Sequence, residues 1–152
     1  MSQPLPAFFA SLPGFSRLAP GDLAGIAAAC EEKTFERGTL LFAEDSPGGE
    51  MFILKAGAVQ VIKHFRGKDQ ILATLLPGDI LGDMSLIDGR PHSADCKASQ
   101  NTQAVVLPRA AYEEMMRERP KVAILVMEYL SHMLCDRIRR ANRTLQLFHL
   151  SD

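Results

Sequence analysis

The residues best suited to bind a ligand lie between Leu75 and Ala94, where a turn, a glycine and a short helical turn follow one another. Pro77-Gly78 breaks the chain after an apolar strand, and Gly82 opens a helical turn that ends at Asp88-Gly89. The N–H groups at a helix start lack partners within the helix and form an electropositive end, which suits an anion. From the spacing alone, an ordinary loop between two strands is the favoured alternative.

Three ionisable side chains in this stretch bear on the choice between these readings. Asp83 either caps the short helix, a position that Asp favours, or contacts a ligand. Arg90 and His92 point to the same side if their segment is extended, so both can face a bound anion. The alternative for Arg90 is a solvated arginine in a turn.

The stretch resembles the phosphate-binding cassette of the cyclic-nucleotide-binding domain family, the sensor module of catabolite activator proteins, cyclic-nucleotide-dependent kinases and gated channels. The matching segments are Pro77-Gly78-Asp79, Leu81-Gly82-Asp83, Met84 to Ile87, and Pro91-His92-Ser93-Ala94. Two charged positions depart from the family pattern: Asp83 stands where the family has Glu, and His92 stands where it has Arg.

The resemblance implies a role for each matching position. In the family the Arg pairs with the cyclic phosphate, the Glu accepts a hydrogen bond from the ribose 2′-hydroxyl, and Ser93 matches a position that touches the phosphate. The helix positions that meet the base correspond to Arg137 and Ile138. His92 offers two donors only when protonated, and Arg90 is the nearest substitute cation. The candidate ligand-binding residues are therefore Gly82, Asp83, Met84, Ser85, Arg90, His92, Ser93, Ala94, Arg137 and Ile138.

Elements of two kinds must position these residues. Phe8, Phe9 and Leu12 have helical spacing, and a second helix is predicted to start at Pro20-Gly21-Asp22. From Thr34 the period changes to two, and short strands are expected at 39–42, 51–54, 59–63, 70–75, 93–98 and 103–107. Many short strands separated by turns predict an antiparallel barrel or jelly roll, and the resemblance implies the family's β-roll.

One turn departs from the family pattern. Glu44-Asp45-Ser46 stands where the family usually has Glu-Gly-Asp, so the sequence leaves the conformation of this loop open. A glycine at the middle position adopts a positive φ without steric cost, whereas an aspartate does so less readily.

After Pro108 the pattern is helical again, with a short helix over 109–118 and a longer one from about Lys121 to Leu150. Apolar residues recur along the longer helix at steps of three and four, which suits pairing with a second helix. The stripe is Leu130, Leu134, Ile138, Ala141, Leu145 and Phe148. Packing against the chain's own β-roll and a two-helix dimer seam are both compatible with it.

Composition excludes several classes of function. The chain has 152 residues with a formal net charge of −1, which predicts no strong attraction to nucleic acid or anionic membrane. Cys30, Cys96 and Cys135 are far apart and are expected to be reduced, which fits a cytoplasmic setting, and no signal peptide or membrane span is visible. The histidines are isolated, so neither a metal site nor enzyme activity of the cupin kind is expected.

The sequence therefore predicts a single α+β domain with an antiparallel, jelly-roll-like β-roll and a long C-terminal dimerisation helix. We expect a helical lead-in over 1–33, a β-roll over 34–108 with its cassette at 81–94, and C-terminal helices over 109–152. The predicted function is a regulatory module that senses cAMP or cGMP by binding it through a variant phosphate-binding cassette. No further cofactor is expected. The alternative is a degenerate β-roll that acts as a dimeric protein-interaction scaffold.

The expected partners follow from the same resemblance. They are the cyclic nucleotide, a second copy of the chain and an unidentified protein effector. The family's transcription factors carry a helix-turn-helix domain after the long helix, whereas this chain stops at Asp152, so no DNA binding by this chain is expected. The cluster of Arg137, Arg139, Arg140 and Arg143 is interpreted as a solvated helix face.

Overall fold

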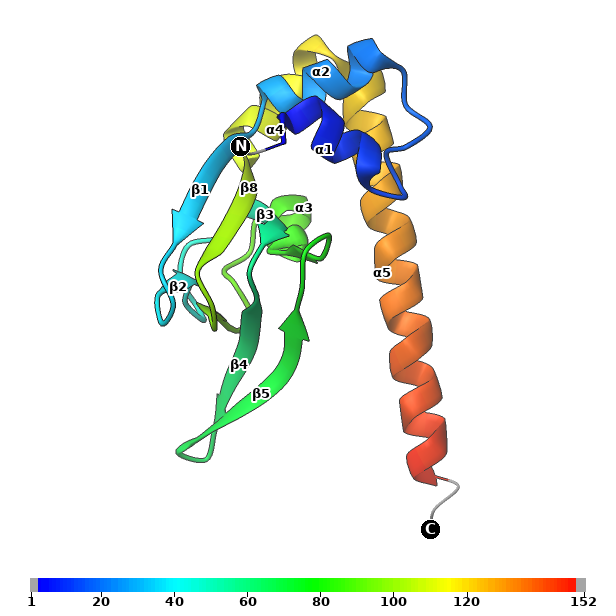
Figure 1. Ribbon diagram of the computed structural model, residues 1–152. Helices are drawn as coiled ribbons and strands as arrows, with labels where there is room; N and C mark the ends of the chain where they lie inside the picture. The colour runs from blue at the N-terminus through cyan, green and yellow to red at the C-terminus, as the bar shows by residue number, and fades with distance from the viewer. Residues whose placement is uncertain (1–2, 150–152) are drawn as a thin grey trace.

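The computed structural model describes residues 3–149, apart from the side chain of Phe148, and this range forms five helices and eight strands (Figure 1). The elements in chain order are α1 (Leu5–Ser11), α2 (Pro20–Ala28), β1 (Glu31–Phe35), β2 (Leu40–Phe42), β3 (Glu50–Ala56), β4 (Val59–Phe65), β5 (Lys68–Leu75), β6 (Ile80–Leu81), α3 (Asp83–Asp88), β7 (Asp95–Ala98), β8 (Thr102–Pro108), α4 (Arg109–Glu118) and α5 (Pro120–His149). The predicted fold class, an α+β chain with an antiparallel β-roll and a long C-terminal helix, is confirmed.

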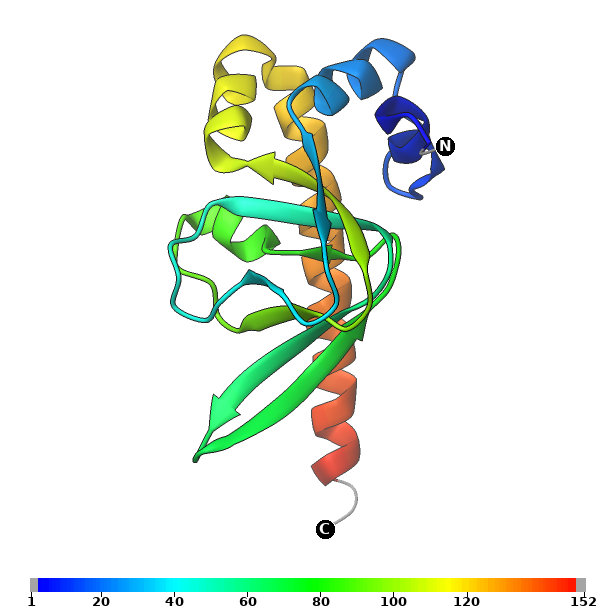
Figure 2. The same ribbon diagram turned by 60° about the vertical axis from the view of Figure 1, so that its left-hand side comes forward.

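The strands form two four-stranded sheets in which every pairing is antiparallel. One sheet has the order β1-β8-β3-β6 and the other β2-β7-β4-β5. Between them lies a small core that includes Phe52, Leu54, Val59 and Val106, each at most 1% exposed. The β4–β5 hairpin projects from the roll at the end away from α1, α2 and α4 (Figure 2).

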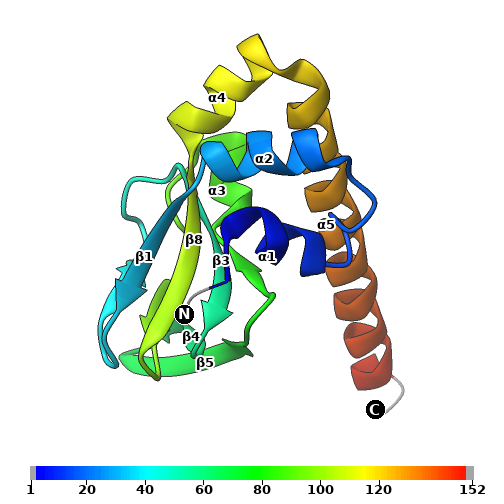
Figure 3. The same cartoon turned by 45° about the horizontal axis from the view of Figure 1, so that its top comes forward.

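A larger core joins the first sheet to the helices. It contains Phe9, Phe15, Ile53, Val105 and Leu130, which are buried together with residues of α2 and α4. Figure 3 shows α1 and α2 lying between the roll and α5, so the N-terminal helices connect the roll to the first half of α5. This core fixes the position from which α5 passes the cassette.

Strand β1 begins inside the segment that the sequence analysis assigns to the helical lead-in. Its sequence, Glu31-Glu32-Lys33-Thr34-Phe35, is mostly polar and four of its five residues are exposed. The strand exists because it pairs along its whole length with the buried strand β8, from Glu31 opposite Val106 to Phe35 opposite Thr102. Its own residues carry no apolar alternation that predicts it.

Helix α5 divides into two halves with different surroundings. Val122, Val126 and Leu130 are buried in the large core, whereas Ile138 and Leu145 are 59% and 58% exposed. The predicted apolar stripe therefore packs against the chain's own body at Leu130 and is open to solvent farther along. Leu150, the predicted end of the helix, and the side chain of Phe148 lie outside the described residues. Within residues 3–149, no helix combines the length and the apolar character needed to span a membrane.

Candidate functional site

The short helix α3 is defined by a glycine at each end. Gly82 is its N-cap with φ 74° and Gly89 its C-cap with φ 71°, the left-handed region that favours glycine. A Cβ at Gly82 would lie 2.4 Å from the backbone oxygen of Glu50, so the close approach of β3 also requires a glycine there. The suggestion that Asp83 caps this helix is wrong, because Gly82 occupies the cap and no side chain bonds to it.

Two side chains hold α3 in place. The Ser85 hydroxyl donates to the Arg90 carbonyl oxygen (2.6 Å) and accepts from the Gly49 N–H (2.9 Å), so it ties the cassette to the loop before β3. Arg109 donates through Nη1 to the carbonyl oxygens of Ser85 (3.3 Å) and Leu86 (3.2 Å), near the C-terminal end of α3. Sequence reasoning missed Arg109, and its only local signal is its position directly after Pro108.

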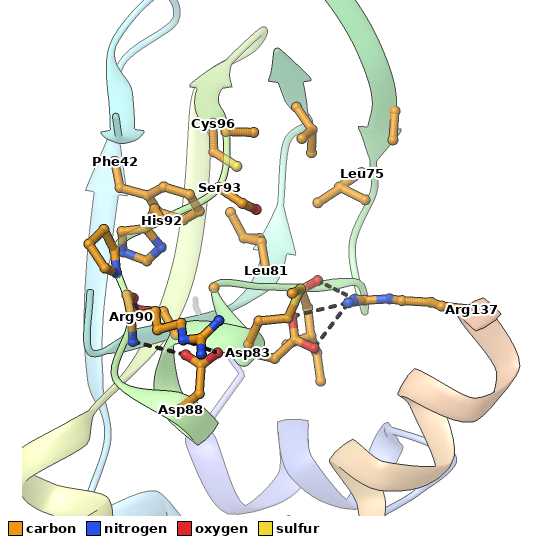
Figure 4. A pocket seen from close by; sticks show the side chains of 18 residues that line it. Phe42, Leu75, Leu81, Asp83, Asp88, Arg90, His92, Ser93, Cys96 and Arg137 are labelled. Carbon is orange, nitrogen blue, oxygen red and sulfur yellow. Dashed lines mark hydrogen bonds and ion pairs between the residues drawn. The ribbon is translucent and has the colours of Figure 1, made fainter. Parts of the chain in front are cut away.

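A cavity of about 430 Å³ opens beside α3 (Figure 4). Its walls come from the cassette, from β2, β4, β5 and β7, and from α5. All the candidate residues predicted from the sequence line it except Ile138, whose side chain is exposed. The lining also includes apolar residues that sequence reasoning did not single out: Phe42, Val61, Ala73, Leu75, Ile80, Leu81 and Cys96.

His92, at the family's Arg position, is buried in the cavity wall. It is 5% exposed and its ring stacks on Phe42, with centroids 3.7 Å apart and an interplanar angle of 14°. Burial lowers the pKa of His92 below its ordinary value, while the charge of Glu50 partly opposes this shift. At neutral pH the wall therefore presents an uncharged ring at this position.

The loop that precedes β3 supports the backbone of His92. The Asp45 N–H donates to the His92 carbonyl oxygen (2.8 Å), and the His92 N–H donates to the Ser46 carbonyl oxygen (3.2 Å). Asp45 has φ 62°, so it adopts the left-handed conformation at the position where the family has glycine. The loop conformation that the sequence left open is thus the one that a glycine would take.

Arg90 also lines the cavity, but its environment differs from that of His92. Its side chain is 84% exposed, and its Nε lies 4.0 Å from Oδ2 of Asp88. The Arg90 N–H donates to Oδ1 of the same aspartate (2.9 Å). The guanidinium is thus weakly held at the exposed rim of the cavity.

Asp83 is paired with Arg137 of α5, which is 54 residues later in the chain. Nη1 of Arg137 lies 3.1 Å from Oδ1 and 3.0 Å from Oδ2 of Asp83, and Nη2 donates to the Ile80 carbonyl oxygen (2.9 Å). Figure 4 shows these contacts at the side of the cavity nearest α5. The pair joins the cassette directly to the C-terminal helix.

The thiols and the metal-ligating side chains add no reactive centre within the described residues. Cys30, Cys96 and Cys135 form no disulfide, and burial raises the pKa values of Cys30 and Cys96 to about 12. Across residues 3–149, no group of three or more His, Cys, Asp or Glu side chains is arranged to hold a metal ion. The cavity beside α3 is therefore the candidate ligand site.

The chain is similar to known proteins in sequence and in fold. The family model described as "Cyclic nucleotide-binding domain" matches residues 32–119. The chain is 27% identical over 132 residues to the CRP-like cAMP-activated global transcriptional regulator of Mycobacterium tuberculosis, covering 86% of this chain and 57% of that protein. It is 28% identical over 141 residues to the cyclic AMP receptor protein of Thermus thermophilus, covering 92% of this chain and 63% of that protein.

The structural comparison agrees with the sequence matches. A cyclic nucleotide-binding domain from Methylobacillus flagellatus superimposes with a TM-score of 0.81 at 28% identity, covering 90% of this chain and 77% of that one. The chain spans about three fifths of the length of the two regulators that it matches. The family model spans most of the β-roll, the cassette and α4, and this chain belongs to the cyclic nucleotide-binding domain family.

Proposed function

We propose that this chain is a regulatory module that senses a cyclic nucleotide, cAMP or cGMP. The observation that carries the proposal is the cavity of about 430 Å³ at the junction of the cassette, the roll and α5. Its volume falls within the roughly 300–1,000 Å³ of small-molecule sites. The names of the M. tuberculosis and T. thermophilus relatives, which refer to cAMP, support the same ligand class.

The cyclic phosphate is assigned to the cassette end of the cavity. The first N–H groups of α3 have no partner within the helix, and they follow the left-handed Gly82. Ser93 lies on the same wall and is exposed. We assign Arg90 as the cation for this end, because it lines the cavity whereas His92 is neutral and stacked on Phe42.

The nucleoside is assigned to the apolar side of the cavity. Val61 of β4, Ala73 and Leu75 of β5 and Cys96 of β7 line this side. A purine buries both of its faces most favourably against such side chains. This assignment leaves the choice between adenine and guanine open.

The output of the module is assigned to α5. Arg137 lines the cavity and belongs to α5, so a movement of the cassette reaches this helix directly. Ile138 and Leu145 expose an apolar stripe beyond that point, which we assign to a parallel homodimer or a protein effector. The cytoplasmic setting expected from the unpaired cysteines is part of the same proposal.

Calorimetric titration of the purified chain with cAMP, cGMP and 5′-AMP tests the proposal. We expect saturable binding of a cyclic nucleotide and much weaker binding of 5′-AMP. Arg90→Ala is expected to weaken binding by roughly ten- to a hundredfold, since a charge-assisted hydrogen bond contributes about 1.5–3 kcal/mol. The matched control is Arg139→Ala, which removes an exposed arginine of α5 that does not line the cavity. No heat of binding with either cyclic nucleotide at millimolar concentration would refute the proposal.

A second candidate function is favoured by one observation, the stacking of a neutral His92 on Phe42. In this reading the module has lost its nucleotide and acts as a dimeric interaction scaffold. It predicts a stable dimer whose thermal unfolding temperature is unchanged by millimolar cAMP or cGMP, whereas a bound ligand must raise that temperature.

A further inference from the structure

The contact between Asp83 and Arg137 changes what the cavity presents to a ligand. The Asp83 side chain is 3% exposed, and the side chain of Arg137, whose Nη1 contacts both carboxylate oxygens, is 38% exposed. A carboxylate only accepts hydrogen bonds, and a guanidinium only donates them. On this part of the cavity wall, the more accessible polar side chain is therefore Arg137, a hydrogen-bond donor.

The same contact gives Asp83 a structural task. Arg137 ties α5 to the roll, because it bonds to the Asp83 carboxylate and to the Ile80 carbonyl oxygen. Removing Arg137 leaves the buried Asp83 carboxylate without this partner, and an unpaired buried carboxylate is strongly unfavourable.

We infer that Asp83 anchors α5 through Arg137 and does not accept a hydrogen bond from the ribose, so the cavity does not read the 2′-hydroxyl of a cyclic nucleotide. This inference rests on the proposed function. A site that reads the hydroxyl through a carboxylate loses about 1.5–3 kcal/mol with the deoxy ligand, which is roughly ten- to a hundredfold in affinity. For this chain, the dissociation constants of a cyclic nucleotide and of its 2′-deoxy analogue are expected to agree within about threefold.

The test compares the dissociation constants of cAMP and 2′-deoxy-cAMP, and of the corresponding guanine pair, by calorimetry. Wild type and the control Arg139→Gln are expected to show ratios within about threefold. Arg137→Gln uncovers the Asp83 carboxylate. In this variant the ratio of the two dissociation constants is expected to rise to about tenfold or more in favour of the ribose ligand. Arg137→Lys keeps a cation against Asp83 and should keep the wild-type ratio.

Each outcome decides the matter. A wild-type preference of tenfold or more for the ribose ligand overturns the inference and leaves the proposed function standing. An unchanged ratio in a folded Arg137→Gln overturns the assignment to Arg137. If that variant does not fold, the ratios of wild type and Arg137→Lys still decide. Absence of binding by every ligand refutes the proposed function itself.

Discussion

The imidazole ring of His92 lies almost parallel to the phenyl ring of Phe42, with a centroid distance of 3.7 Å. This contact places a neutral, buried ring where the family carries a permanent cation. The backbone around it keeps the cassette geometry, because its N–H and carbonyl groups both bond to the loop over residues 43–49. The departure from the family is thus one of charge rather than of backbone shape.

The first prediction restores that charge. His92→Arg places a forked cation beside Ser93 and Ala94, and affinity for a cyclic nucleotide should rise by roughly ten- to a hundredfold at pH 7.5. Calorimetry on wild type and the variant measures the change. The control is His132→Arg, which adds the same charge on an exposed part of α5 that does not line the cavity.

An affinity equal to that of wild type would contradict this expectation. In that case Arg90→Ala separates two explanations. It weakens wild-type binding if Arg90 already serves the phosphate, and it changes nothing if the cavity does not accept a nucleotide.

The second prediction concerns two histidines whose pKa values move in opposite directions. Hydrogen bonds to Asp95 and Asp69 raise the pKa of His64 above its ordinary value, whereas burial lowers the pKa of His92. Titration of the ring resonances by NMR should therefore show His64 protonated at a pH where His92 is neutral. If His92 stayed protonated to a higher pH than His64, or if both rings titrated with the same midpoint, the two described environments would be contradicted.

The third prediction turns the His64 shift into a stability profile. A raised pKa in the folded state means that the contribution of His64 is fully present below the unfolded pKa of about 6.5 and is lost as pH rises through the folded pKa. The free energy of unfolding of wild type, relative to His64→Gln, should fall over that window. Urea unfolding at several pH values measures it, and a difference that does not vary with pH would contradict the shift.

The fourth prediction tests the pair that joins the cassette to α5. Arg137→Ala should lower the free energy of unfolding by roughly 1.5–3 kcal/mol, because it leaves the buried Asp83 carboxylate unpaired. Asp83→Ala/Arg137→Ala should be more stable than Arg137→Ala alone, and Arg139→Ala should be close to wild type. Denaturant unfolding of wild type, Asp83→Ala, Arg137→Ala and the double variant gives the coupling energy, and strictly additive effects would show that the pair carries none.

The fifth prediction concerns the exposed half of α5. Ile138→Lys and Leu145→Lys together should convert a homodimer into a monomer, because both side chains lie on the apolar stripe and are more than half exposed in the single chain. Leu147→Lys, on the opposite side of the helix at 100° per residue, is the matched control. Light scattering at tens of micromolar protein measures the oligomeric state. A monomeric wild type would exclude a dimer contact along α5.

The elements that the sequence predicted are those with strong local signals. Glycines and alternating apolar residues marked most strands, and Gly82 with Gly89 marked α3, because positive φ and turn chemistry are local properties. Strand β1 was missed because its polar residues are strand only through pairing with β8. Local patterns do not contain that information.

The candidate site was predictable to a similar degree. The backbone positions of the cassette and Arg137 line the cavity as the resemblance implied, whereas Ile138 does not. The pairing of Asp83 with Arg137 spans 54 residues and the stacking of His92 on Phe42 joins β2 to the cassette, so neither has a spacing that a sequence reveals. Both contacts depend on tertiary packing.

The most direct test of nucleotide binding follows the backbone amides of the cassette in ¹H–¹⁵N correlation spectra during titration with cAMP and with cGMP. We expect saturable shifts at Gly82, Met84 and Ser93, which line the cavity, and none at Gly21, which has open space around it in α2. Spectra in which the cassette amides do not move at millimolar ligand, or in which shifts are spread evenly over both regions, would contradict the account.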